Sequence, residues 1–128
     1  MKESLPLGSL PVWEEDGNTI CQSSAILRML GIRLGYYSTD PNTMWAIDSL
    51  IDFMEDNYGG MLGRAAAVVF GGQPTPEMDA KFLAYYDKMV PFLTKRLEGH
   101  GKKYIAGTAT MTIADLKVYQ GFTAIFEN

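Results

Sequence analysis

Gln22 and Ser23 are the residues of this sequence best suited to bind a ligand. They stand where a β-prone segment, residues 19–21, gives way to a helix-forming segment that includes Ala25. The first backbone N–H groups of a helix have no acceptor within the helix, and the helix dipole makes that end partly positive. A carboxylate could therefore be held there by the free N–H groups together with the side chains of Gln22 and Ser23.

The same positions also have an ordinary structural interpretation. Ser23 fits an N-cap, since its hydroxyl can accept from the first free N–H groups. Pro11 lies in an expected strand over residues 10–13 and has no N–H to give to a ladder. It can open the strand, lie at a sheet edge, or follow a cis Leu10–Pro11 bond that turns the Leu10 backbone outward. Judged by local physics alone, an edge-strand proline and a plain N-cap are favoured.

The elements around these residues are predicted to be a β-hairpin and a helix. Residues 10–13 and 19–21 are short and β-prone, and the acidic residues and Gly17-Asn18 between them predict a hairpin turn. Helix formers follow directly. A segment rich in turn formers, residues 36–42, then separates this unit from a helical remainder.

Three further helices are expected in that remainder. Apolar residues recur at spacings of three and four from Thr43 onward, which predicts an amphipathic helix. Thr75 and Pro76 fit the N-cap and the first helical position of the next helix. Thr112 and Asp115 have the spacing of a capping box at the start of the last one, with aspartate in place of the usual glutamate.

The first of these helices carries two further sets of candidate residues. Asp48, Asp52 and Asp56 fall four residues apart, and like charges at that spacing weaken a helix by roughly a few tenths of a kcal/mol per pair. A partner cation would explain them, and a solvated acidic face is the alternative. Met54 and Tyr58 could line a hydrophobic pocket.

Composition restricts the possible functions. A chain of 128 residues fits one domain or two small packed units, and its net charge of −4 argues against nucleic acid and anionic membranes as partners. No apolar run approaches the roughly 18 residues that span a bilayer. A single cysteine, Cys21, fits a reducing compartment, so the cytosol is expected. We expect Cys21 to be a buried strand residue and His100 to be a surface residue, neither of them catalytic.

The stretch LPLGSLPVWEEDGNTICQSSAILRML, residues 5–30, resembles the glutathione-binding segment of the glutathione transferase family. It is most similar to the sigma class, which includes the haematopoietic prostaglandin D synthases. The matching pieces are residues 6–8, residues 10–12, and Gln22-Ser23 leading into residues 25–28. The Thr-Ile-Ala-Asp run at residues 112–115 is similar to the start of a buried central helix in the same family.

This resemblance implies an α+β fold and a glutathione site. Residues 1–36 would be the C-terminal half of a thioredoxin-like domain, a β-hairpin plus helix, and residues 43–128 would belong to an all-α glutathione transferase C-terminal domain. In the family the proline is cis, the residue before it pairs through its backbone with the cysteinyl part of glutathione, and the Gln-Ser pair holds the γ-glutamyl carboxylate. The implied glutathione-binding residues are Lys2, Leu10, Pro11, Gln22, Ser23 and Asp52.

The resemblance also implies a dimer and a second substrate. Asp52 would reach across a homodimer toward the glutathione amino group, with Asp48 beside it. Ile51 replaces an acid that sigma enzymes often carry, so no metal is expected there. The second substrate of the family would be a small hydrophobic electrophile. The family's thiol-activating tyrosine belongs to an earlier strand, so no catalytic residue is assigned among these 128 residues.

Three functions are compatible with these observations. The preferred one is a portion or short form of a glutathione transferase, in which the thiolate of glutathione attacks an electrophile or isomerises a prostaglandin-like endoperoxide. The alternative is a truncated, non-catalytic structural subunit of a larger assembly. The third is a carrier that binds glutathione without performing chemistry on it.

Overall fold

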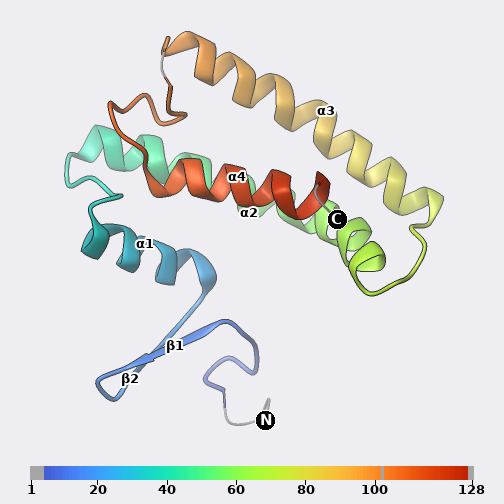
Figure 1. The fold of residues 1–128 in the computed structure, drawn as a ribbon, viewed down its shortest axis with the longest axis horizontal. Coiled ribbons are helices and arrows are strands. Elements are labelled where there is room, and N and C mark those ends of the chain that lie inside the picture. Colours follow the sequence, from blue (N-terminus) through green and yellow to red (C-terminus); the bar gives the residue numbers. More distant parts are fainter. Residues whose placement is uncertain (1–4, 102, 127–128) are drawn as a thin grey trace.

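The computed structural model describes residues 5–101 and 103–126. In chain order the elements are β1 (Val12–Glu15), β2 (Asn18–Cys21), α1 (Ser23–Leu34), α2 (Pro41–Val69), α3 (Pro76–Gly99) and α4 (Ile113–Phe126). The hairpin and α1 lie at one end of the molecule, and α2 packs against both α3 and α4 (Figure 1). The predicted order, a hairpin and a helix followed by further helices, is confirmed.

The hairpin turn lies one residue earlier than the sequence suggested. β1 continues to Glu15, and β2 begins at Asn18 directly opposite it. The two connecting residues are Asp16 and Gly17, with φ of 48° and 76°. Two-residue hairpin turns need positive φ at both central positions, and Asp-Gly meets that requirement better than Gly-Asn. The turn therefore lies within the predicted segment of acidic residues and Gly17-Asn18, but Asn18 belongs to β2 and not to the turn.

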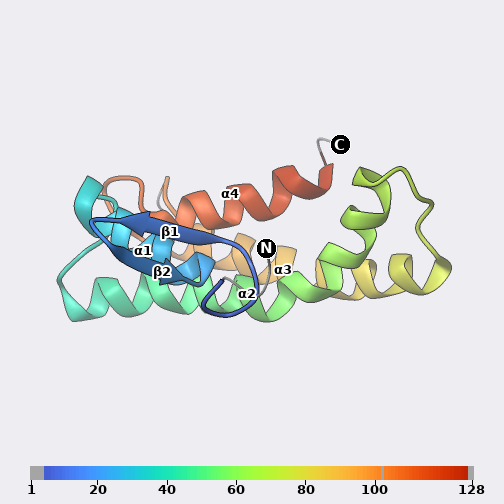
Figure 2. The same cartoon turned by 90° about the horizontal axis from the view of Figure 1, so that it is seen from below.

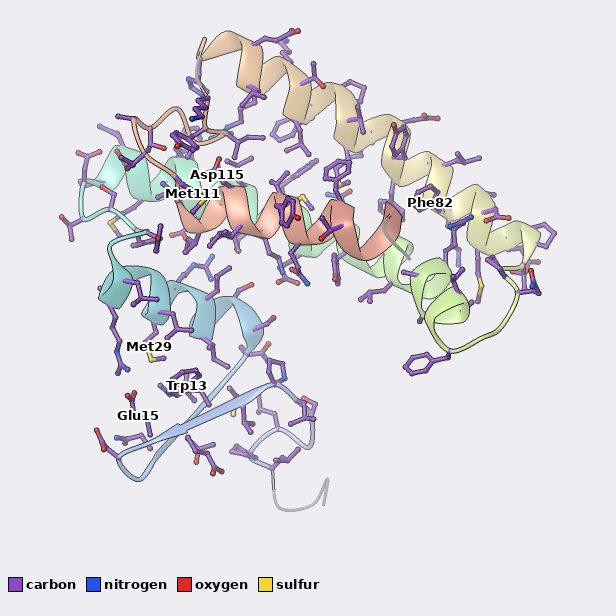
Figure 3. All side chains as sticks on the ribbon, in the orientation of Figure 1. Trp13, Glu15, Met29, Phe82, Met111 and Asp115 are labelled. Carbon is purple, nitrogen blue, oxygen red and sulfur yellow. The ribbon has the colours of Figure 1, made fainter. Side chains whose placement is uncertain are left out.

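An acidic side chain on β1 connects the hairpin to the end of α1. Glu15 Oε2 accepts a hydrogen bond from Trp13 Nε1 at 3.4 Å and forms an ion pair with Arg33. The hydrogen bond from Arg33 is the main reason that the pKa of Glu15 lies below its ordinary value, and the bond from Trp13 adds to it. Figure 3 shows Trp13 and Met29 in the space between β1 and α1.

α2 begins two residues before the predicted start. Asp40 is its N-cap and accepts from the Thr43 N–H at 2.8 Å, while Pro41 occupies the first turn, where a missing N–H leaves no bond unmade. The helix then continues as one element to Val69. Its C-terminal turns run in a different direction from the rest of the helix (Figure 2).

The starts of α3 and α4 follow the predicted local chemistry. Thr75 caps α3 by accepting from the Met78 N–H at 3.3 Å. At the start of α4, Asp115 Oδ2 accepts from the Thr112 N–H at 2.8 Å and from the Thr112 hydroxyl at 3.0 Å. The carboxylate half of the capping box is therefore confirmed. The reciprocal half is absent, because the Asp115 N–H bonds to the Thr112 carbonyl and not to its hydroxyl.

The hydrophobic core lies where α2, α3 and α4 meet. The largest apolar side chains without exposed surface, or nearly so, are Ile47, Leu50, Ile51, Met54, Met89 and Ile113. α1 joins this core through Gly31, which is buried against Ile113 of α4. No helix in the described ranges has both the length and the apolar character needed to cross a membrane.

Candidate functional site

The open end of the hairpin meets the N-terminus of α1. Val12 pairs with Cys21 across the sheet, so Pro11 and Gln22 leave the hairpin at the same end. The Leu10–Pro11 peptide bond is cis, as the resemblance implied. The Leu10 side chain is 74% exposed. The hairpin register therefore brings the backbone of Leu10 to the same end as Gln22.

Gln22 has an unusual backbone conformation directly before α1. Its φ is 73° and its ψ is 117°, a region that glycine adopts readily and that costs another residue roughly 1–3 kcal/mol. Its carbonyl accepts from the Ile26 N–H at 3.0 Å and so forms the first hydrogen bond of α1. Its side chain is exposed and has no hydrogen-bond partner among the described residues. The backbone of Gln22 therefore starts α1, whereas its side-chain amide makes no hydrogen bond within the described part of the fold.

Ser23 is the first residue of α1 and not its N-cap, so the predicted cap was wrong. Gln22 occupies the cap position, and its side chain makes no capping bond. The hydroxyl of Ser23 is exposed and unbonded within the described part of the chain. The N–H groups of residues 23–25 precede the first intrahelical bond, and none of them has an acceptor among the residues that the structure describes. The start of α1 therefore presents free N–H groups, a hydroxyl and an amide at the positive end of a helix dipole.

The neighbouring residue, Ser24, begins a polar network that leads to α2 and α4. Its hydroxyl donates to Glu55 Oε1 at 2.7 Å, and the same oxygen accepts from Lys117 Nζ at 2.7 Å. Burial raises the pKa of Glu55, but the hydrogen bonds from Lys117 and Ser24 outweigh it and leave the pKa below its ordinary value. The network holds the start of α1 against the two core helices.

Arg28 neutralises much of the acidic face of α2. Its Nε donates to Asp48 Oδ1 at 2.7 Å and its Nη2 to Asp52 Oδ1 at 2.9 Å. The second Asp48 oxygen accepts from the Tyr37 hydroxyl at 2.7 Å, and burial together with this bond raises the pKa of Tyr37 to about 12. For Asp48 and Asp52, the partner cation that the aspartate spacing suggested is therefore Arg28 of the same chain. The Asp52 side chain is still 67% exposed.

Met54 and Tyr58 do not line a common pocket. Met54 has no exposed surface and reaches Gly121 of α4 in the core. A side chain without exposed surface cannot touch a substrate, so in this structure Met54 is a core residue. Tyr58 is half-buried between α2 and α4, where its hydroxyl accepts from Gln120 Nε2 at 3.1 Å and Lys117 Nζ lies 5.2 Å from its ring centroid.

Lys2 and Ile51 are the remaining positions to which the resemblance assigned a role. Lys2 lies outside the described residues. Ile51, which stands where the resemblance expects an acid, is fully buried and packs in the core. An acid at that position would lose its hydration, which accounts for the apolar residue.

Glu55 and Lys117 were missed by the sequence analysis. The sequence of α4 gave one indication that Lys117 has a partner, since Lys117 and Asp115 are its only charged residues. A lysine within such an apolar helix must either reach solvent or find a buried acid. Its partner could not be chosen from the several acids of α2, because helix packing decides which of them faces α4.

Comparisons with known proteins extend the resemblance seen in the sequence. No family model matches the chain. It is 31% identical over 121 residues to Glutathione S-transferase 1 of Ascaris suum, covering 92% of this chain and 58% of that protein. The fold superposes on a Caenorhabditis elegans glutathione S-transferase with a TM-score of 0.81 and 27% identity, covering 98% of this chain and 62% of the other. For a Nu-class enzyme of Haemonchus contortus the TM-score is 0.76 and the identity 30%, with 99% and 63% covered.

The chain therefore spans less than two thirds of each of these three proteins. Within that span the predicted fold class, half of a thioredoxin-like domain followed by an all-α domain, is confirmed by the structural neighbours. The chain has the fold of the glutathione S-transferases, and its homologues and structural neighbours support its membership of that family.

Proposed function

We propose that this chain supplies the γ-glutamyl side of a glutathione site in a glutathione transferase. The observation that carries the proposal is the pair Gln22 and Ser23 at the N-terminus of α1, at the same end of the hairpin as the Leu10–Pro11 bond. Both residues are exposed, and their side chains have no hydrogen-bond partner among the described residues. A backbone conformation that is unfavourable for glutamine is typical of a residue that serves a ligand and not the fold.

The binding chemistry follows from the groups present. The γ-glutamyl carboxylate would accept from the Ser23 hydroxyl, the Gln22 amide and the free N–H groups at the start of α1. Hydrogen bonds to a charged acceptor contribute about 1.5–3 kcal/mol each. The cysteinyl part of glutathione would pair with the Leu10 backbone next to Pro11, which is exposed at the same end of the hairpin. Lys2 would lie near the glycyl carboxylate.

The proposed reaction is attack of the bound thiolate on a small hydrophobic electrophile, or isomerisation of a prostaglandin-like endoperoxide. The residues of this chain would contribute positioning, which converts an encounter of two molecules into a reaction within one complex. Activation of the thiol is assigned to none of the 128 residues. The polar surface around Tyr58, between α2 and α4, is the proposed boundary of the electrophile pocket.

We also propose the sigma-class arrangement for Asp52 in a cytosolic homodimer. Only Oδ1 of Asp52 is engaged by Arg28, and Oδ2 has no hydrogen-bond partner among the described residues. That oxygen could accept from the amino group of a glutathione bound to the second subunit. The strength of this contact is limited by the exposure of Asp52 to solvent.

The test is a calorimetric titration of the chain and its variants with glutathione and with the dipeptide Cys-Gly, which lacks the γ-glutamyl group. Gln22→Gly removes the amide and relieves the unfavourable φ, and Ser23→Ala removes the hydroxyl. Each should weaken glutathione binding about tenfold or more while leaving Cys-Gly binding unchanged. Asp52→Asn enters the same series, with a smaller expected loss.

Gln73→Gly is the matched control, because Gln73 is an exposed glutamine in the loop between α2 and α3. Gln22→Gly should also raise the free energy of unfolding by about 1 kcal/mol, since glycine accepts the observed φ. A stabilised variant that binds glutathione less well would separate a ligand-binding role from a structural one. Equal binding of glutathione to Gln22→Gly and wild type would refute the proposed site.

A further inference from the structure

Asp16 and Gly17 form the exposed tip of the hairpin and are the only Asp-Gly pair in the sequence, which has no Asn-Gly pair. Their φ values of 48° and 76° are those of a type I′ turn, and Glu15 and Asn18 pair directly beside it. Figure 1 shows this turn away from α2, α3 and α4. The tip is therefore open to solvent, at the opposite end of the hairpin from the proposed glutathione site.

Two groups at this tip are free to react with each other. The backbone carbonyl of Asp16 accepts from Asn18 Nδ2 at 3.4 Å, but its carboxylate has no hydrogen bond or ion pair among the described residues. The N–H of Gly17 likewise has no acceptor in the described ranges. No atom outside the turn lies within 4 Å of the point where a side chain on Gly17 would begin. The Gly17 nitrogen is therefore an unhindered nucleophile next to an unpaired carboxyl group.

We propose that Asp16 is a modification site, at which the aspartate converts to isoaspartate and disrupts the pairing of β1 with β2. The Gly17 nitrogen attacks Cγ of the protonated Asp16 carboxyl group, a C–N bond forms, and the carboxyl hydroxyl leaves as water with the proton of the nitrogen. Water then adds to one carbonyl of the resulting cyclic imide and breaks its bond to that nitrogen. Opening at the original backbone carbonyl leaves the chain joined through the Asp16 side chain. The water lost is regained, so the sequence needs no oxidant, reductant or cofactor.

The turn has to open before the ring can close. In a type I′ turn the Gly17 nitrogen lies on the opposite side of the Asp16 Cα–C bond from the side chain, so this bond must rotate first. Within the described residues the sheet consists of β1 and β2 alone, joined by four residue pairs. A two-stranded hairpin is marginally stable in water, and chain tips of this kind open locally at low cost. The stability of the hairpin therefore sets the rate of the modification.

Isoaspartate adds one methylene carbon to the main chain of the two-residue turn. Glu15 and Asn18 then no longer lie opposite each other, and the altered register extends along β2 toward Gln22. Glu15 also accepts from the Trp13 indole N–H at 3.4 Å, so the environment of that indole changes. Binding of glutathione should weaken as well, because Gln22 and Leu10 lose their common end of the hairpin. This last consequence rests on the proposed function.

The test incubates the whole chain in H₂¹⁸O at neutral pH and analyses its peptides by mass spectrometry. Hydrolysis of the imide should leave one ¹⁸O atom in the peptide that contains Asp16, and an isoaspartate-specific carboxyl methyltransferase should methylate that peptide. Asp16→Asn should form isoaspartate severalfold faster, because ammonia leaves more readily than water and Asn-Gly keeps the turn. Asp16→Gly keeps the positive φ without a carboxyl group and should form none. Asp87, exposed on α3 and followed by Lys88, is the internal control.

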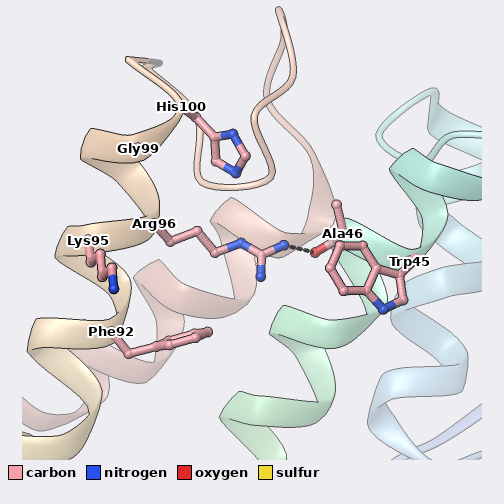
Figure 4. A pocket seen from close by; sticks show the side chains of 7 residues that line it. All are labelled: Trp45, Ala46, Phe92, Lys95, Arg96, Gly99 and His100. Carbon is pink, nitrogen blue, oxygen red and sulfur yellow. Dashed lines mark hydrogen bonds between the residues drawn. The ribbon is translucent and has the colours of Figure 1, made fainter.

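The two tryptophans of the sequence give the structural readout. In a ¹⁵N-labelled chain the indole N–H signal of Trp13 should split as isoaspartate accumulates, while that of Trp45 stays single. Trp45 lies at the cleft between α2 and α3 (Figure 4), to which the hairpin contributes no residue. Uptake of ¹⁸O at Asp16 no faster than at Asp87, or isoaspartate that leaves the Trp13 signal unchanged, would overturn the proposal. If the Trp13 signal splits but unmodified chain fails to bind glutathione, the modification site stands and the proposed glutathione site is wrong.

Discussion

Replacing Asp115 should destabilise the chain, because its carboxylate accepts three hydrogen bonds in front of α4. Its carboxylate accepts from the Ile105 N–H at 2.8 Å, from the Thr112 N–H at 2.8 Å and from the Thr112 hydroxyl at 3.0 Å. Ile105 and Thr112 are both buried. Asp115→Ala would therefore leave two buried N–H donors without an acceptor, at a cost of about 1–3 kcal/mol each.

The expected loss in the free energy of unfolding is thus about 2–6 kcal/mol, and water that reaches the two donors would bring it toward the lower end of that range. A chain of this size has a total stability of roughly 5–15 kcal/mol, so Asp115→Ala should lose a large share of it. Asp115→Asn keeps one acceptor oxygen and should lose about half as much. At about 3–5 °C per kcal/mol, the melting temperature should fall by about 10 °C or more for the alanine variant.

The assay is urea-induced unfolding followed by circular dichroism, with thermal unfolding as a second measurement. Asp87→Ala is the control, because Asp87 is exposed on α3, and its effect should be within about 0.5 kcal/mol. If Asp115→Ala were no less stable than Asp87→Ala, the three hydrogen bonds would not fix the loop before α4 as described here.

Two further predictions concern packing and pH. Gly31→Ala should lower the free energy of unfolding by about 1–3 kcal/mol, because its Cβ would lie 2.7 Å from Ile113 Cγ2. Gly63→Ala, in an open part of α2, should raise the free energy of unfolding by about 0.5–1 kcal/mol. Urea midpoints that move in the same direction for both variants would contradict this. Because the pKa of Glu55 is lowered below 4.5 in the folded chain, the stability it contributes is present above about pH 4.5 and lost as the pH falls below it. Glu55→Gln should therefore show a smaller loss of unfolding free energy between about pH 6 and pH 3 than wild type, and an equal loss would exclude this role.

Local chemistry made the starts of α3 and α4 predictable. Thr75 and Pro76 specify a cap and a first turn without help from the rest of the chain, and Thr112 with Asp115 does so at α4. The turn at Asp16-Gly17 was also available in the sequence, since the backbone requirement for two positive φ angles favours Asp-Gly over Gly-Asn.

Other features depend on how distant segments pack. The backbone angle of Gln22 is set where β2 passes into α1, so it could not be predicted from the N-cap preferences that pointed to Ser23. Arg28 of α1 pairs with Asp48 of α2 across the interface between the two helices. The aspartate spacing along α2 indicated only that a positive charge could lie nearby, and not which residue carries it. The hydrogen bond from Arg96 of α3 to the Ala46 carbonyl of α2 likewise joins residues 50 positions apart, so it could not be predicted from either helix alone.

The most direct test of the glutathione site follows the backbone N–H of Ser23 and the side-chain amide of Gln22 in a ¹⁵N-labelled chain. If the γ-glutamyl carboxylate binds at the start of α1, adding glutathione should shift both signals to saturation, and adding Cys-Gly should move neither. If glutathione leaves both signals in place, or if Cys-Gly shifts them equally, the γ-glutamyl carboxylate is not recognised there and the proposed site is wrong.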